Sequence, residues 1–269
     1  MPLASATAQL AGRGVYVPSA PAAEIEDDKY LVRFARNIEE VDAALKVRFE
    51  VFNLELGEGL DSSFQTGRDR DEFDATCHHL VVTCKVTNDV VGTYRVRTIE
   101  MARSAEGFYS AREFDLNCLP PEVFNQSLEL GRACIAKSHR NRQVLFLLWK
   151  GLALYAIARQ KRFLFGCCSL TSQDESEGQQ MLDHLTRNGH MHSAFFVRPK
   201  PGFECGIYGL GAAQPEQVKV PRLFDSYLAV GAKVCSPPAI DRQFKTIDFF
   251  VVFDFQELDA KTRRLFLTV

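Results

Sequence analysis

The stretch LELGRACIAKSHRNRQ, residues 128–143, decides the fold, because it joins an apolar strand to a basic turn and then to a long apolar run. Glu129 and Arg132 lie inside the strand, where a buried charge without a partner would be costly. Positions three apart on a regular strand point to opposite faces of the sheet. For both side chains to enter one cleft, the strand must carry a β-bulge, which Gly131 would favour.

Such a bulge would also release backbone N–H groups from the hydrogen-bond ladder of the sheet. The groups concerned would be near Ala133, Cys134 and Ile135. Free N–H groups stabilise an acyl carbonyl oxygen as it becomes an oxyanion. The strand therefore indicates a place for acyl-transfer chemistry.

The basic turn that follows leads into a helix N-terminus, where unpaired N–H groups and positive potential suit a phosphate. Arg140 and Arg142 would strengthen that site. An ordinary basic turn between a strand and a helix is the alternative, and the turn taken alone does not separate the two interpretations.

The composition is that of a globular protein, with 46% hydrophobic and 25% charged residues in a chain of 269. A formal net charge of −2 gives no overall attraction to nucleic acid. The eight cysteines contain no CxxC pair and no zinc-ligand spacing, so we expect a reducing, cytoplasmic compartment and no metal site. The longest apolar run, residues 144–158, carries Lys150 at its middle and indicates a buried helix.

Hydrophobic periodicity and turn signals predict an α/β three-layer domain around one mixed central sheet. We expect a disordered leader at 1–29, a single domain at 30–258 with a C-terminal extension, and a tail at 259–269. The expected strands are 30–35, 78–86, 90–99, 128–136, 162–170 and 247–255, with a hairpin at 87–89. The expected helices are 38–56, 143–160, 175–188 and 221–231, with a short one near Ala111 and a long loop at 199–221.

The first helix places a charge on its apolar face, where Arg48 lies one turn before Phe52. A buried guanidinium needs an acidic partner, and the loop RDRDEFDAT offers Asp71 and Asp74. Arg95 adds a further charge inside the third strand. The alternatives are an arginine that reaches solvent at the helix edge and a solvated run of charges in the loop.

The order of strand, bulge, basic turn and helix resembles the GNAT superfamily of acyltransferases. The glycine-rich turn that most members use for acetyl-CoA is missing after Arg140, where Asn141 and Arg142 stand instead. Four further motifs resemble a branch that takes long acyl chains from acyl carrier protein. These motifs are R-x-x-x-F at Arg48 and Phe52, D-x-x-D at Asp71 and Asp74, G-x-x-R at Gly92 and Arg95, and E-x-x-R at Glu129 and Arg132.

Within that branch the segments GRACIAKSHRN, LLWKGLALYA and LFGCCSL are most similar to the lyso-ornithine lipid synthases. The resemblance implies an N-acyltransferase that joins a long, 3-hydroxylated acyl chain to the α-amine of an amino acid, with ornithine expected first. The donor would be an acyl-phosphopantetheine thioester on acyl carrier protein, with acyl-CoA as the other possibility. No permanently bound cofactor is expected.

The resemblance also suggests roles for individual residues. Glu129 would be the general base and Arg132 its catalytic partner. The acceptor or the charge network around it would involve Arg48, Asp71, Asp74 and Arg95, and the apolar chain would meet Phe49, Phe52 and Phe146. The donor would contact Ala133, Cys134, Ile135, Arg140, Asn141 and Arg142, while Lys150, Lys161 or Arg162 would contact the acidic carrier protein.

Three other functions remain open from the sequence. They are an acyl-homoserine-lactone synthase, a CoA-dependent acetyltransferase of small molecules, and a non-catalytic acyl-binding protein on the same scaffold. We expect a cytoplasmic protein, and the amphiphilic product adds a peripheral membrane contact as an alternative.

Overall fold

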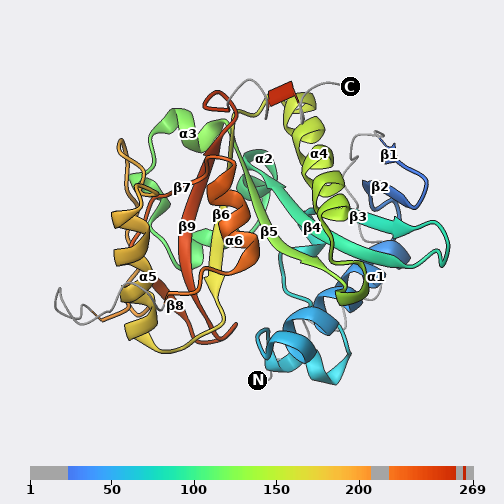
Figure 1. The fold of residues 1–269 in the computed structure, drawn as a ribbon, viewed down its shortest axis with the longest axis horizontal. Helices are drawn as coiled ribbons and strands as arrows, with labels where there is room; N and C mark the ends of the chain where they lie inside the picture. The colour runs from blue at the N-terminus through green and yellow to red at the C-terminus, as the bar shows by residue number, and fades with distance from the viewer. Residues whose placement is uncertain (1–23, 207–217, 259–262, 265–269) are drawn as a thin grey trace.

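A nine-stranded mixed sheet in the order β1-β2-β3-β4-β5-β6-β9-β7, with β8 paired to β9, forms the centre of the computed structural model (Figure 1). The structure describes residues 24–206, 218–258 and 263–264. Neighbouring strands are antiparallel except for β5 and β6, which are parallel. The strands are β1 Ile25–Glu26, β2 Tyr30–Phe34, β3 His78–Cys84, β4 Val90–Thr98, β5 Ser127–Ile135, β6 Phe163–Leu170, β7 Lys233–Val234, β8 Ala239–Asp241 and β9 Thr246–Asp254.

The α-helices connect these strands and begin at recognisable caps. They are α1 Ile38–Phe49, α2 Ile99–Ser104, α3 Pro121–Asn125, α4 Arg142–Ala158, α5 Glu175–Arg187 and α6 Arg222–Ala229. The side chain of Asn37 accepts a hydrogen bond from the N–H of Glu40 at the start of α1, and Asn141 does the same for Val144 at the start of α4.

Shorter helical turns fill the connections. A π-helix, η1 Glu50–Leu56, continues α1 and is ended by Gly57 at φ 69°, which completes the helix expected over 38–56. The 3₁₀ turns are η2 Asp61–Gln65, η3 Asp74–Thr76, η4 Tyr109–Arg112, η5 Leu116–Cys118 and η6 Lys137–His139.

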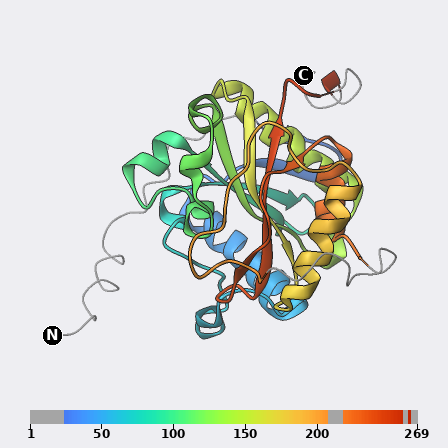
Figure 2. The ribbon, with the colours of Figure 1, turned by 90° about the vertical axis from the view of Figure 1, so that its left-hand side faces the viewer.

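The alternation of side chains along each strand produces two cores, one on each face of the sheet. On β3, Leu80 and Val82 pack beneath α4, whereas Val81 between them packs against α1. The other half of the sheet is arranged in the same way: α5 and α6 cover one face, and α2 and α3 cover the opposite face. Figure 2 shows β9 running between α5 and α3, so the molecule has the three layers expected from the sequence.

The sheet splits open where β5 and β6 part. These two strands pair only from Ser127 and Phe163 to Glu129 and Phe165. Beyond that point β5 continues along β4, while β6 continues along β9, so a wedge opens between them (Figure 1). At its apex Gly166 lies so close that an added Cβ would be 2.2 Å from the carbonyl oxygen of Leu130.

Most elements fall within a few residues of their expected positions, but the leader is an exception. Residues 25–26 form β1 and pair with β2, so the boundary expected at residue 30 was wrong by several residues. The rest of the leader and most of the tail expected at 259–269 lie outside the described residues. No helix among the residues that the structure describes is long and apolar enough to cross a membrane.

Candidate active site

Strand β5 carries the bulge that its charges require. Arg95 of β4 lies opposite Gly131 and Thr93 lies opposite Cys134, so β5 contains one residue more than β4 over this interval. The extra residue is Arg132, whose φ of 49° is left-handed. The bulge is confirmed, but the unusual backbone conformation belongs to Arg132 and not to Gly131, and it costs about 1 kcal/mol or more.

The bulge turns Glu129 and Arg132 toward the same face of the sheet. Leu128 and Ile135 pack in the core beneath α4. Glu129 contacts η4, and Arg132 contacts the loop before β3, both on the opposite face. A straight strand would have sent one of the two charges into the apolar core.

The carboxylate of Glu129 is buried and held by three hydrogen bonds from η4. It accepts from the backbone N–H of Tyr109 at 2.8 Å, from the N–H of Ser110 at 2.6 Å and from the Ser110 hydroxyl at 2.7 Å. Burial raises the pKa of Glu129 above its ordinary value, and the hydrogen bonds from Ser110 and Tyr109 oppose that shift. No ion pair among the described residues joins Glu129 to Arg132.

Three arginines and three aspartates form a closed ring of buried ion pairs beside Glu129. The charges alternate around it, and the shortest N–O distances between neighbours lie between 2.5 and 3.2 Å. In order, the members of the ring are Arg48, Asp69, Arg132, Asp71, Arg95 and Asp74. The six formal charges cancel, so the ring is neutral although every member is buried or nearly so.

The residues of the ring differ in whether they are buried or line the cavity. Arg48 donates to Asp69 and Asp74 and is fully buried behind the sheet, and only Arg95 and Arg132 of the ring line the cavity. Burial would raise the pKa of Asp74, but Arg48 and Arg95 hold it well below its ordinary range. Asp69, which the sequence analysis missed, lies two positions before Asp71 in the alternating run RDRD.

A cavity of about 980 Å³ occupies the wedge between β5 and β6. Glu129 and the bulge line one part of it, including the expected residues Ala133, Cys134 and Ile135. The α4 face supplies Leu145, Leu148, Trp149 and Leu152, which share one side of the helix. The cavity therefore combines a charged wall with a long apolar wall.

Of the aromatic residues expected to contact the acyl chain, some line the cavity and others do not. Phe52 lines the cavity and packs edge-on against Phe244, with ring centres 5.4 Å apart. Phe49 does not line it, because its ring packs against Phe64 instead. Phe146 does not line it either, because it lies about 100° around α4 from Leu145.

The basic turn borders the same cavity through Arg140, Asn141 and Arg142. The guanidinium of Arg140 donates to Glu55 at 2.7 and 2.8 Å and to the carbonyl of Ile135. Asn141 caps α4, and Arg142 is exposed. The turn therefore presents a helix N-terminus at the edge of the cavity.

Arg97 is a further cavity residue that the sequence analysis did not single out. It faces Glu129 across the β4–β5 pair and is 1% exposed. Its Nη1 donates to the Thr76 hydroxyl at 2.6 Å, whereas Nε and Nη2 make no hydrogen bond. Nη2 lies 3.5 Å from Glu106, beyond good hydrogen-bond geometry.

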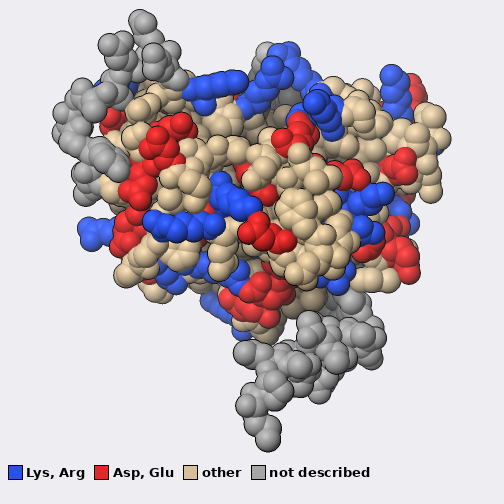
Figure 3. Space-filling view, turned by 90° about the horizontal axis from the view of Figure 1, so that it is seen from below, with Lys and Arg blue, Asp and Glu red and all other residues tan. Residues whose placement is uncertain are grey.

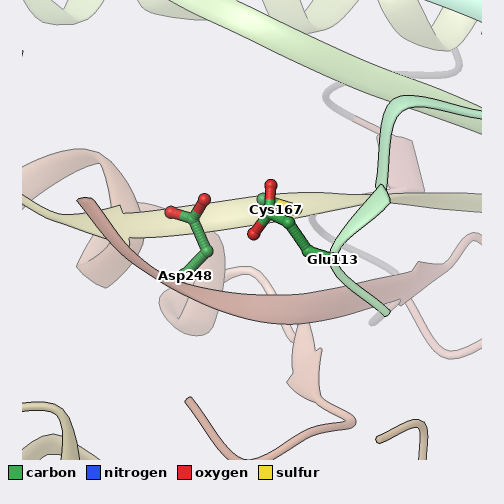
Figure 4. A group of neighbouring side chains, drawn as sticks. All are labelled: Glu113, Cys167 and Asp248. Atoms are coloured by element: carbon green, nitrogen blue, oxygen red, sulfur yellow. The ribbon is translucent and has the colours of Figure 1, made fainter. Parts of the chain in front are cut away.

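A buried acidic pair lies at the other end of the polar wall. Ligand atoms of Glu113, Cys167 and Asp248 all lie within 4.8 Å of one another, which makes them the one candidate group for a metal ion among the residues described (Figure 4). Burial and the charges of Asp248 and Asp241 raise the pKa of Glu113 well above its ordinary value. Burial also raises the pKa of Asp248 to about 6.

Comparison with known proteins shows what the chain resembles. The family profile of the acetyltransferase (GNAT) domain matches residues 47–150. The L-ornithine N(alpha)-acyltransferase of Agrobacterium fabrum is 32% identical over 245 residues, covering 85% of this chain and 82% of that protein. The enzymes of the same name from Rhizobium meliloti and Brucella abortus are each 30% identical, covering 85% and 86% of this chain and 81% and 86% of their own lengths.

Solved structures are less similar. The acyl-homoserine lactone synthase LasI has a TM-score of 0.48 at 12% identity, covering 88% of this chain and 94% of its own. FeeM, an N-acyl amino acid synthase from uncultured soil microbes, has a TM-score of 0.45 at 10% identity, covering 87% and 93%. Neither likeness bears on what this chain does.

Proposed function

The chain belongs to the GNAT-domain acyltransferase family that includes the L-ornithine N(alpha)-acyltransferases, and from that premise we propose that it acylates the α-amine of ornithine. The donor is a thioester of a long, 3-hydroxylated chain on acyl carrier protein. The observation that supports this most directly is Glu129, a buried carboxylate with a raised pKa at the apex of the wedge.

Glu129 acts as the general base. An α-amine is largely protonated near neutral pH and attacks a thioester only after losing a proton. The carboxylate takes that proton directly or through a water molecule. Its hydrogen bonds from η4 fix its orientation, and its raised pKa brings it nearer to the working pH.

The bulge of β5 stabilises the oxyanion. Beyond Glu129 no described strand pairs with β5 on the side that faces β6, so its backbone groups there are open to the cavity. N–H groups of residues 133–135 would donate to the thioester oxygen as the amine adds. The carbon–sulfur bond then breaks. The second proton that the nitrogen must lose to become an amide passes to the departing sulfur, which leaves as a thiol, and the first proton stays on Glu129.

Arg97 holds the acceptor's α-carboxylate. It lies opposite Glu129 on the adjacent strand, its Nε makes no hydrogen bond, and its Nη2 has only the long contact with Glu106. Arg95, which also lines the cavity, already donates to Asp71 and Asp74. Arg132 donates to Asp71 and forms an ion pair with Asp69. Arg97 is therefore a better partner for a new carboxylate than Arg95.

The acyl chain lies along the apolar wall formed by Phe52 and α4. A volume of about 980 Å³ is at the upper end of ordinary ligand cavities and leaves room for a long chain beside the acceptor. The aromatic rings of Trp149 and Tyr227 stack at 5.7 Å on this wall.

The phosphopantetheine phosphate of the donor meets the N-terminus of α4, with Arg140, Asn141 and Arg142 around it. On the face seen from below in Figure 1, basic and acidic side chains are interspersed and no single sign dominates (Figure 3). The formal net charge of −2 gives no long-range attraction to an acidic carrier protein, so its recognition depends on local groups at this turn.

The test is a reaction of the purified protein with ornithine and 3-hydroxyacyl chains on either acyl carrier protein or CoA. Mass spectrometry should find Nα-acylornithine, with carrier-bound donor used at much higher kcat/KM. Equal efficiency with acyl-CoA would contradict the donor assignment, and absence of any acylornithine would contradict the acceptor assignment. Adding S-adenosylmethionine and finding a lactone would point to a homoserine-lactone synthase instead.

A further inference from the structure

We propose that Glu113 and Asp248 bind the side-chain ammonium of a diamino acid and so make the acceptor site selective for a cationic side chain. This inference rests on the proposed function, because it assumes that the acceptor amine reacts beside Glu129. It assigns a role to two buried acids that the acyl-transfer chemistry does not use.

The first support is that these acids have oxygen atoms without donors. Glu113 is 1% exposed and Asp248 is 3% exposed. Both carboxylate oxygens of Glu113 and Oδ1 of Asp248 are buried and accept no hydrogen bond from a donor group of the described chain, and the two carboxyl groups interact with each other. A buried, ionised carboxylate without hydrogen-bond donors is strongly destabilised. We therefore expect these oxygen atoms to accept hydrogen bonds from a bound ligand.

The second support is the sign of the local charge. Asp241 and Glu58 add two further carboxyl groups that interact electrostatically with the pair. The nearby cation is Arg132, and it is already shared between Asp69 and Asp71 in the neutral ring. The corner therefore holds more carboxyl groups than cations, and a bound ammonium group would favour their ionised forms.

The third support is access from the cavity. Asp248, Cys167 and Glu58 line the same cavity as Glu129, and Glu113 lies next to Cys167 and Asp248 (Figure 4). A ligand reaching this corner from the wedge would come within reach of Asp248 first.

The fourth support is the spacing from the proposed base. Ser110 Oγ donates to Glu129 at 2.7 Å and lies 3.6 Å from Cys167 Sγ, which in turn is within 4.8 Å of the acidic oxygens. Together these contacts span the separation between Glu129 and the oxygen atoms of the acidic pair. An extended side chain of three methylene groups can bridge it, with a hydrogen bond at each end. One acceptor can thus place its α-amine at Glu129 and its side-chain ammonium at the acidic pair.

A metal ion is the other occupant that these ligands would allow. Glu113, Cys167 and Asp248 supply only three ligands, and burial raises the pKa of the Cys167 thiol well above its ordinary value. A thiol that resists deprotonation is a poor metal ligand. An ammonium group, which donates three hydrogen bonds, suits three unpaired carboxylate oxygens better.

The experiment compares acceptors that differ only at the side-chain terminus: L-ornithine, its neutral and larger carbamoylated analogue L-citrulline, and L-norvaline, which lacks the terminal group. The intact protein should use ornithine with a kcat/KM about 10- to 100-fold above norvaline, the usual value of a hydrogen bond to a charged group. Glu113→Gln and Asp248→Asn should each reduce that ratio toward one.

Asp254→Asn is the matched control, because Asp254 lies on the same strand and pairs with Arg162 outside the cavity. It should leave the ratio unchanged. Circular dichroism and thermal unfolding would establish that each variant is folded. If both variants fail to fold, the acceptor preference of the intact protein decides the question.

The outcomes separate the two proposals. If the intact protein makes no acylornithine, the proposed function fails. If it makes acylornithine but shows no preference for ornithine over norvaline, and the variants show the same ratio as the intact protein, only this inference is overturned. A bound metal whose removal by a chelator abolishes the preference for ornithine would overturn it as well.

Discussion

Arg97 and Glu129 are directly paired across β4 and β5, yet no ion pair among the described residues joins them. Glu129 takes its hydrogen bonds from η4, and Arg97 donates to Thr76. Two opposite charges on adjacent strands normally stabilise a sheet by contact. Their separation leaves the carboxylate able to accept a proton and the guanidinium able to bind a carboxylate, both on the cavity wall.

Replacing Glu129 with Gln should slow amide formation by about 10²- to 10⁴-fold, because the amide cannot take the proton from the amine. Single-turnover measurement with carrier-bound acyl donor is the check. The amide keeps the size of the side chain, so donor binding should change little. Single-turnover chemistry at nearly the original rate would remove Glu129 from the role of base.

Replacing Arg97 with Met should raise the KM for ornithine by about 10- to 100-fold, because a charged hydrogen-bonded contact to the acceptor is lost. The effect on kcat should be smaller. Arg103→Met is the control, since Arg103 is exposed and donates to the side chain of Asn125, and neither residue lines the cavity. A loss confined to kcat, with KM unchanged, would contradict this assignment.

Replacing Arg48 with Met should lower the free energy of unfolding by about 3–5 kcal/mol, because it leaves buried Asp69 and Asp74 short of a counter-ion. Breaking the partly exposed pair between Arg68 and Asp42 by Arg68→Met should cost about 1 kcal/mol or less. Urea unfolding of both variants measures the difference. Similar losses of unfolding free energy in the two variants would show that the buried ring stabilises the fold no more than a partly exposed pair does.

Replacing Glu113 with Gln should stabilise the protein above pH 6. The pKa values of Glu113 and Asp248 are higher in the folded chain than in the unfolded chain. The folded state therefore binds more protons, and its stability falls as pH rises from about 4 through the folded pKa. Removing Glu113 should make that fall shallower and add about 1–3 kcal/mol at pH 8, measured by urea unfolding across the pH range. A steeper fall would contradict the raised pKa.

The sequence predicted the sheet, its principal helices and the bulge, because each leaves a local signal. Apolar runs with period 2 or 3.6 identify strands and helices, and a charge pair three positions apart on β5 demands an irregular strand. Short elements such as β7 and β8 leave no such signal, since pairing with β9 and not their own composition makes them strands.

The residues of the candidate site were harder to predict from the sequence than the fold was. Asp248 lies within TIDFFVVF and gives the same signal as Glu129, a charge in an apolar strand, so the rule applied to β5 would have found it on β9. Ser110 lies in the 3₁₀ turn η4 and Glu113 directly follows it, a segment without periodicity, and only tertiary contacts bring them to β6 and β9. The ring closes through Asp69, whose two partners come from α1 and β5 and cannot be paired from spacing alone.

The left-handed backbone at Arg132 persists because Asp69 and Asp71 hold its side chain from a different part of the chain. A glycine at this position would relax the backbone but leave Asp69 and Asp71 with only one arginine partner each. The kink of β5 is thus encoded some sixty positions upstream. Inserting or deleting residues between η1 and β3 would therefore deform the wedge itself, although neither Asp69 nor Asp71 lines the cavity.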